Sequence, residues 1–342
     1  MKYDLYSLLF DLCSSGGVSG CEDDAAEKAA KYLSRFAEVS RDALGNVVGK
    51  IGGDSPCILL DAHIDRIGLT VTSVDSNGFV KAVKRGGVDA RTVSAGEVTI
   101  WGSRKVFGVV SSIPPHLSKG DDASKAPDLS EVCIDTGLGE EAQNIIRAGD
   151  TVTINGAQRK LLENKAVSPC VDDRAGVAAI LRCLEILEER TKKTCALTVV
   201  FSVQEETSGS GATTAGFASG ADEAIAVDVG FASAPGVKDE ESGKLGGGAM
   251  IGFAATLDNA MSKKLVSLAK EKDIKWQSDV MGGSTSTNSD SIQACAGGIK
   301  CALISIPIRN MHTCVETVCI DDIEATAQLM AAYILERSEG NA

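Results

Sequence analysis

Two adjacent carboxylates, Glu205 and Glu206, stand just beyond the apolar run 196–203. A run of this kind predicts a buried strand that delivers the two acids at its carboxyl end. Neighbouring side chains of an extended segment point in different directions, so one carboxylate can bind a cation while the other faces a substrate. An isolated Glu-Glu pair is usually part of a polar loop, but three further apolar runs of this chain also lead to His or Asp.

The other runs supply two histidines and two aspartates. One is followed by His63 and Asp65, another ends at Asp228, and the last leads to His312. The chain contains only three His, and a lone His near a core is more often structural than a ligand. Asp65 shifts that balance for His63, because a metal-bound imidazole usually needs a carboxylate to fix its tautomer. The third histidine, His116, lies in a polar segment that we expect to be a mobile loop without a catalytic role.

A pair of aspartates, Asp172 and Asp173, opens a segment whose apolar residues recur at helical spacing from Val177 to Leu187. Asp is a favoured N-cap residue, and one Asp is enough for a cap. The pair therefore leaves one carboxylate available as a ligand, and the sequence does not say which of the two it is.

This inventory of oxygen and imidazole donors without thiolates suits Zn²⁺, Co²⁺ or Mn²⁺. Two such ions about 3.5–4 Å apart, bridged by one carboxylate, activate water and polarise a carbonyl group. A carboxylate that holds no ion can then act as general base. The motifs are weak one by one, and their occurrence together in this order predicts a metal-dependent hydrolase.

The elements that must position these residues indicate an α/β protein of about two domains, the usual prior for 342 residues. The apolar runs predict a mixed sheet flanked by helices, with the candidate ligands at strand carboxyl ends, where open sheets bind ligands. Between residues 68 and 162, short β-like runs alternate with turn signals. We therefore expect a small β-barrel domain, 68–162, inserted into a main domain formed by 1–67 and 163–342.

The composition of the chain excludes some classes of binding partner. A net charge of −13 and a pI near 4.8 argue against nucleic acid or an anionic membrane as partner. The 11 Cys are scattered singly, which fits a reducing cytoplasm better than a disulfide framework. No apolar run approaches the roughly 18 residues that would span a bilayer. We expect a soluble cytoplasmic protein.

The successive motifs resemble those of the tetrahedral (TET) aminopeptidases, which are cocatalytic metallopeptidases also labelled glutamyl or leucyl aminopeptidases or "cellulase M". The resemblance covers nearly the whole chain and implies their zinc-peptidase-like fold. The motifs that carry it are Ser19-Gly20-x-Glu22, Asp42 to Asn46, Ala62-His63-Ile64-Asp65, Asp172-Asp173-Arg174, Glu205-Glu206, Val227-Asp228, Leu245-Gly246-Gly247-Gly248 and Arg309-x-Met311-His312.

By this resemblance, each subunit holds two divalent metal ions, zinc in the first place and cobalt or manganese otherwise. Asp172 is then expected to bridge the two ions. His63 and Asp228 would complete the ligands of one ion, and Glu206 and His312 those of the other.

The same resemblance implies roles for further residues. Glu205 is the expected general base, and Asp65 is expected to orient His63. Gly247, Gly248 and Arg309 are expected to contact the substrate. The implied activity is removal of N-terminal residues from short peptides. The inserted domain would be a dimerisation module, and the dimers would assemble into a hollow dodecamer that excludes folded proteins.

This sequence departs from the family pattern beside the expected ligands. Asn310 replaces a usual Tyr, Cys314 a usual Pro, and Pro169-Cys170 a common Lys-Ala-like pair. These changes leave the preferred N-terminal residue open. The two thiols motivate the hypothesis that oxidation or soft metals inhibit the enzyme.

Three other functions stay in view. A metallo-deacylase or carboxypeptidase on a related core would cleave N-acyl or C-terminal substrates. Glycoside hydrolysis needs two acids and no metal, which would leave the histidines without a purpose. A peptide-binding cage without catalysis would bind no metal. The native metal and the assembly also stay open.

Overall fold

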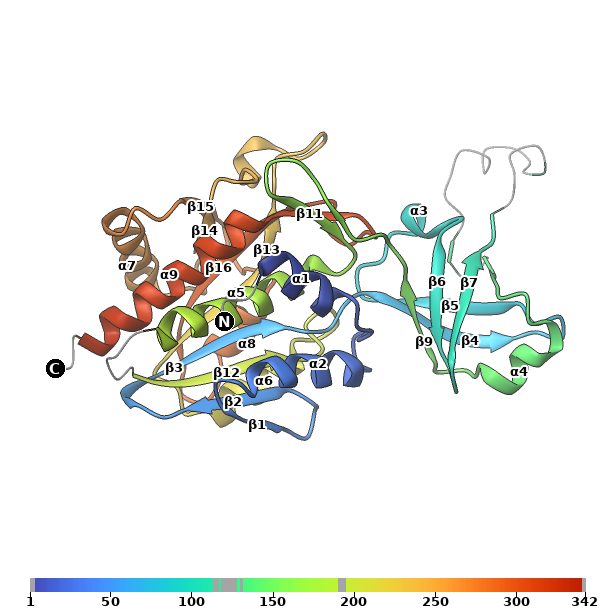
Figure 1. The fold of residues 1–342 in the computed structure, drawn as a ribbon, viewed down its shortest axis with the longest axis horizontal. Helices are drawn as coiled ribbons and strands as arrows, with labels where there is room; N and C mark the ends of the chain where they lie inside the picture. Colours follow the sequence, from blue (N-terminus) through green and yellow to red (C-terminus); the bar gives the residue numbers. More distant parts are fainter. Residues whose placement is uncertain (1–3, 113–116, 118–127, 130–131, 190–194, 340–342) are drawn as a thin grey trace.

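The computed structural model describes residues 4–112, 117, 128–129, 132–189 and 195–339. The predicted polar loop around His116 lies almost entirely outside these residues. Two bodies are visible in Figure 1: a large sheet covered by helices and a smaller barrel at one end of the molecule. Within the described part of the chain, no helix is long and apolar enough to cross a membrane.

Four parallel strands form the centre of the large sheet, in the order β12 (Cys195–Ser202), β3 (Asp54–His63), β13 (Glu223–Phe231) and β16 (Lys300–Arg309). They are the four apolar runs of the sequence. A parallel sheet is buried on both faces, which is why these runs are almost continuously apolar instead of alternating.

Antiparallel strands extend this centre on both sides. Beside β12 lie β2 (Val47–Ile51) and β1 (Glu38–Arg41). Beside β16 lie β17 (Glu316–Cys319), β11 (Lys165–Ser168) and β10 (Arg159–Lys160). A branch of the sheet is formed by β14 (Ala249–Phe253), which pairs with β16, and by β15 (Trp276–Val280), which pairs with β14. The mixed sheet expected from the sequence is thereby confirmed. One detail was wrong: β13 does not end at Asp228, because the next three residues continue to pair with β16.

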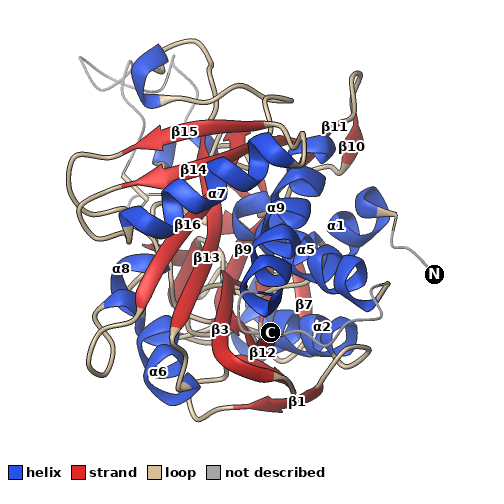
Figure 2. Ribbon diagram, turned by 90° about the vertical axis from the view of Figure 1, so that its left-hand side faces the viewer, coloured by secondary structure: helices blue, strands red, loops and turns tan. Residues whose placement is uncertain are grey.

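Helices cover both faces of the sheet, as Figure 2 shows. Alternate residues of β3 pack against the helices on opposite faces of the sheet: Ile58 and Leu60 on one face and Leu59 on the other. The first layer consists of α1 (Leu5–Cys13), α2 (Asp23–Leu33), α5 (Val171–Glu188), α7 (Asn259–Glu271) and α9 (Ile320–Glu339), and the second of α6 (Ser210–Ser219) and α8 (Asn288–Gln293).

The smaller body is a closed antiparallel barrel with its own apolar core. Its strands follow the order β4 (Gly68–Val74), β5 (Val80–Arg85), β8 (Ile134–Asp135), β7 (Lys105–Val110), β6 (Glu97–Trp101) and β9 (Thr151–Ile154), with the short helices α3 (Ala90–Val93) and α4 (Ala142–Ile145) beside them. The predicted β-barrel is confirmed. The chain is back in the large sheet at β10, and the domain boundaries stay a prediction.

Candidate metal centre and cleft

Five of the predicted residues meet at the carboxyl ends of the parallel strands. His63 is the last residue of β3 and pairs with Ser202, the last residue of β12. Asp228 lies in β13, the neighbour of β3 on its other side. Glu206 follows β12, His312 follows β16, and the first turn of α5 brings in Asp172.

The five side chains form two groups that share one aspartate. In the first group, His63 Nε2 lies 3.0 Å from Asp172 Oδ1 and 3.8 Å from Asp228 Oδ1. In the second, His312 Nε2 lies 3.2 Å from Asp172 Oδ2 and 3.3 Å from Glu206 Oε2. The ligand atoms of each group lie within 4.8 Å of one another. The donors are imidazole and carboxylate, which fits divalent ions such as Zn²⁺.

Crowded acids dominate the electrostatics of these two donor groups. Hydrogen bonds to Asp172 and Glu206 raise the pKa of His312 to about 11. Burial lowers the pKa of His63, but hydrogen bonds to Asp172 and Asp65 outweigh it and raise this pKa well above the usual value. For the carboxyl group of Asp228, burial has the opposite effect and raises the pKa well above its usual range. These shifts reflect the crowding of buried acids, which a bound cation would balance.

Glu205 belongs to neither donor group but lies beside both. Its Oε2 atom is 4.0 Å from His63 Nε2. Burial raises the pKa of Glu205 to about 7. A carboxylate with such a pKa can accept and return a proton near neutral pH.

Asp65 fixes the backbone of the Glu205-Glu206 turn. It is fully buried, and its two oxygens accept the N–H groups of Glu205 (3.0 Å) and Glu206 (3.1 Å). The same carboxylate lies 3.4 Å from His63 Nδ1, so it also faces the imidazole that it was predicted to orient. A second buried acid, Glu22, accepts the N–H of Gln204 at 3.2 Å.

Glu316 is a site residue that our sequence reasoning missed. It is 2% exposed in β17, and its two oxygens accept the N–H groups of Asp172 (3.1 Å) and His312 (2.8 Å). One carboxylate thereby holds the backbone of two candidate ligands. The available signal was an acid four residues after His312, at the start of the short β-like run Glu316-Thr317-Val318-Cys319.

The structure distinguishes the two aspartates of the pair. Asp173 Oδ1 accepts the N–H of Gly176 at 2.9 Å, which is an N-cap interaction. Asp172 contacts both histidines. The cap and the candidate ligand are therefore separate residues.

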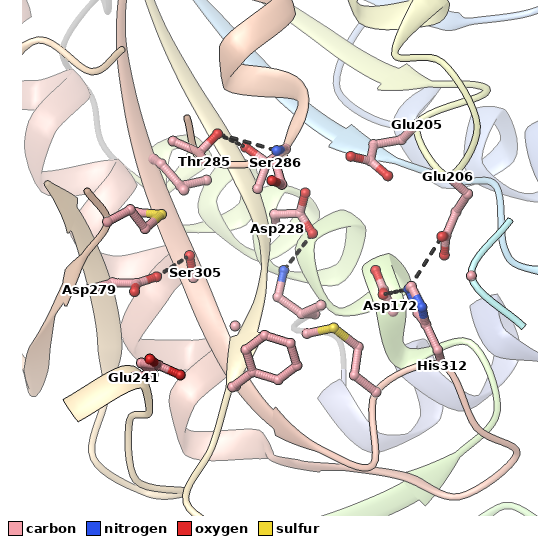
Figure 3. A pocket seen from close by; sticks show the side chains of 18 of the residues that line it. Asp172, Glu205, Glu206, Asp228, Glu241, Asp279, Thr285, Ser286, Ser305 and His312 are labelled. Atoms are coloured by element: carbon pink, nitrogen blue, oxygen red, sulfur yellow. Dashed lines mark hydrogen bonds and ion pairs between the residues drawn. The ribbon is translucent and has the colours of Figure 1, made fainter. Parts of the chain in front are cut away.

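A cleft of about 640 Å³ opens over the donor groups. Figure 3 shows Asp172, Glu206 and His312 at one end and Asp279 and Ser305 at the other. The lining also includes Gly87, Glu205, Asp228, Val229, Gly230, Phe231, Glu241, Val280, Met281, Thr285, Ser286, Thr287, Leu303 and Met311. Gly87 comes from the barrel segment of the chain, so both bodies contribute to the wall.

The three residues expected to contact substrate lie outside this lining. Arg309 is exposed, and its Nε donates to Ser233 O at 2.7 Å. The N–H of Gly248 donates to Asp322 at the start of α9, and a Cβ on Gly247 would meet Gln277. Their substrate contacts stay predictions.

The two thiols noted in the sequence differ in their surroundings. Cys170 is buried, and its Sγ donates to Cys13 O at 3.5 Å. Cys314 is half-buried beside Gly156. Inhibition through these thiols stays a prediction.

Comparisons with known proteins agree with this geometry. Residues 45–329 match the model of the M42 glutamyl aminopeptidase family. The lysyl aminopeptidase of Pyrococcus furiosus is 30% identical over 338 residues, which cover 97% of each chain. An aminopeptidase structure from the archaeon Desulfurococcus kamchatkensis matches with a TM-score of 0.90 and 32% identity, covering 97% of this chain and 94% of that one. The TET1 peptidase of Pyrococcus horikoshii, which can assemble into a tetrahedron or a large octahedral shell, matches with a TM-score of 0.86 and 27% identity over 97% and 99% of the two chains. This chain therefore belongs to the M42 glutamyl aminopeptidase family and is a metal-dependent aminopeptidase.

Proposed function

We propose that this aminopeptidase removes N-terminal residues from short peptides with two divalent ions, zinc in the first place and cobalt or manganese otherwise. The proposal of two ions is supported by the aspartate that the two donor groups share: Asp172 Oδ1 faces His63 of the first group, and Asp172 Oδ2 faces His312 of the second. His63 and Asp228 would complete one site, and Glu206 and His312 the other. When bound, such a pair of ions polarises the scissile carbonyl and makes water more acidic.

Glu205 is the proposed general base. It would take a proton at its carboxylate from the attacking water and deliver it to the leaving amine. Its pKa of about 7, raised by burial, suits a group that must do both. Asp65 holds the backbone of Glu205 in place by accepting its N–H.

The proposed assembly is a homodimer formed through the barrel, with dimers combining into a dodecamer. The supporting observation is apolar surface on one barrel strand: Phe107 and Val109 lie on the same face of β7 and are 56% and 40% exposed. Contiguous exposed apolar residues mark protein interfaces. Light scattering of wild type and Phe107→Glu would test this. A dodecamer that survives the substitution unchanged would place the dimer interface elsewhere.

The activity is tested with a panel of aminoacyl-p-nitroanilides and N-acetylated controls, assayed before chelation, after it, and with Zn²⁺, Co²⁺ or Mn²⁺ restored. We expect cleavage of free-amine substrates only, lost on chelation and regained with metal. Metal analysis should give two ions per chain. Cleavage of the acetylated controls alone would favour the deacylase, and absence of bound metal would favour the cage.

The cytoplasmic location stays an inference from the scattered cysteines, which cell fractionation would test.

A further inference from the structure

The end of the cleft away from the metal donors holds a second polar pair, which we name the distal subsite. It consists of Asp279 on β15 and Ser305 on β16, joined by a hydrogen bond of 3.1 Å from the Ser305 hydroxyl to Asp279 Oδ2. Ser305 is also the direct register partner of Asp228 on the neighbouring strand. The backbone of Ser305 therefore lies one strand spacing, about 5 Å, from that of Asp228 in the first donor group. Asp279 lies beyond Ser305, at the far end of the hydrogen bond.

The charge of Asp279 is unbalanced. Among the cleft-lining residues that the structure describes there is no Lys or Arg. The lining acids nearer the centre belong to the donor groups or serve as the proposed base. The remaining one, Glu241, is exposed and pairs with Lys238 at 2.8 Å. Burial raises the pKa of Asp279, which reflects the unfavourable environment of a carboxylate without a cation.

The wall of the cleft also includes apolar side chains. Val229, Phe231 and Met311 line the cleft together with the backbone of Gly230. Such walls suit the methylene stem of a long basic side chain, whose charged head needs a polar partner at the end. A cleft with apolar side chains in its wall and an acid at its far end matches that shape.

We propose that Asp279, held by Ser305, selects peptides whose N-terminal residue is lysine or arginine. This inference rests on the proposed function of the cleft. A glutamate side chain in the same position would meet a like charge, although the family model carries the description of a glutamyl aminopeptidase. A leucine side chain would leave the Asp279 carboxylate without a partner.

The first test measures kcat/KM on Lys-, Arg-, Leu- and Glu-p-nitroanilide with the metal-loaded enzyme and its Asp279→Asn and Glu241→Gln variants. We expect wild type to prefer Lys and Arg over Leu by about 10- to 100-fold, the range for a hydrogen bond to a charged group. Asp279→Asn should remove this preference, chiefly by lowering the rates on Lys and Arg. Glu241→Gln is the matched control and should keep the preference, because its carboxylate is exposed and already paired.

A second measurement needs no variant. L-Lysine and L-norleucine have the same stem and differ by the terminal ammonium, so their inhibition constants against wild type report the distal charge alone. We expect lysine to bind about tenfold more tightly or better. Equal inhibition by the two would overturn the proposal.

Dipeptides distinguish the two sides of the scissile bond. Lys-Leu should be cleaved faster than Leu-Lys, and the reverse order would place the subsite beyond the bond and overturn the inference. Preference for Glu, or a Lys preference lost in Glu241→Gln, would overturn it too while leaving the aminopeptidase intact. Inactivity on every free-amine substrate with both metals bound would instead defeat the proposed function on which it rests.

Discussion

Asp65→Asn is a sharp test of how the catalytic turn is held. The carboxylate accepts two successive backbone N–H groups, those of Glu205 and Glu206. An amide of the same shape offers one acceptor oxygen, and its NH₂ group then faces the other N–H. The substitution therefore changes hydrogen bonding at a fully buried position without changing side-chain volume.

The expected magnitude follows from these two contacts. A hydrogen bond to a charged group contributes about 1.5–3 kcal/mol, and a buried N–H left without an acceptor costs about 1–3 kcal/mol. We expect a penalty of about 3 kcal/mol, part of which displaces Glu205. If most of this penalty raises the activation free energy by displacing Glu205, kcat/KM decreases about 100-fold.

The assay compares kcat/KM at saturating metal, bound metal and Tm for Asp65→Asn and for Asp322→Asn. Asp322 is a matched control, because it is also buried and accepts two N–H groups, those of Gly246 and Gly248, outside the cleft lining. The control should lose stability and keep kcat. If Asp65→Asn also lowered only Tm and kept kcat within about threefold, the proposed positioning role would be refuted.

Three further predictions concern the metal and the base. Glu205→Gln should lower kcat by about 10²–10⁴-fold with both ions retained, as metal analysis would show; near-normal turnover would exclude Glu205 as base. Hydrogen bonds to carboxylates raise the pKa of His312 to about 11 and also raise that of His63, so these imidazoles hold their protons more tightly than usual without metal. Metal binding should then release protons and tighten as pH rises, which calorimetry in buffers of different ionisation enthalpy measures; binding without proton release would contradict this. Glu316→Gln should weaken metal binding about tenfold, since one of the N–H groups of Asp172 and His312 loses its acceptor; an unchanged dissociation constant would show that Glu316 does not position the ligands.

Much of the candidate site could be predicted from the sequence because its donors follow apolar runs. A parallel strand buried on both faces is continuously apolar, so its carboxyl end is visible where the polar residues begin. His63 and Glu206 were found in this way. Asp228 was found too, although its strand continues, because an acid interrupts an otherwise apolar run.

Contacts between distant parts of the chain could not be predicted. Glu22 belongs to a motif of the resemblance, but its contact with Gln204 spans 182 positions. Glu316 was missed, and it meets Asp172 across 144 positions. Asp279 joins the cleft only because β15 is attached to the sheet through β14, a strand order that no local pattern encodes. Residue pattern alone did not distinguish Asp172 from Asp173, and the bridging role of Asp172 was expected only from the resemblance; the contact with Gly176 identifies Asp173 as the cap.

Gly87 ties the inserted barrel to the chemistry of the main body. A Cβ at this position would lie 2.5 Å from His312 Nδ1, so the loop between β5 and α3 touches a candidate ligand through bare backbone. Deleting the barrel to shorten this enzyme would therefore remove Gly87 as well and expose the His312 imidazole to more solvent. Exchanging barrels between relatives would also exchange the part of the cleft wall that Gly87 forms, together with the proposed oligomerisation surface.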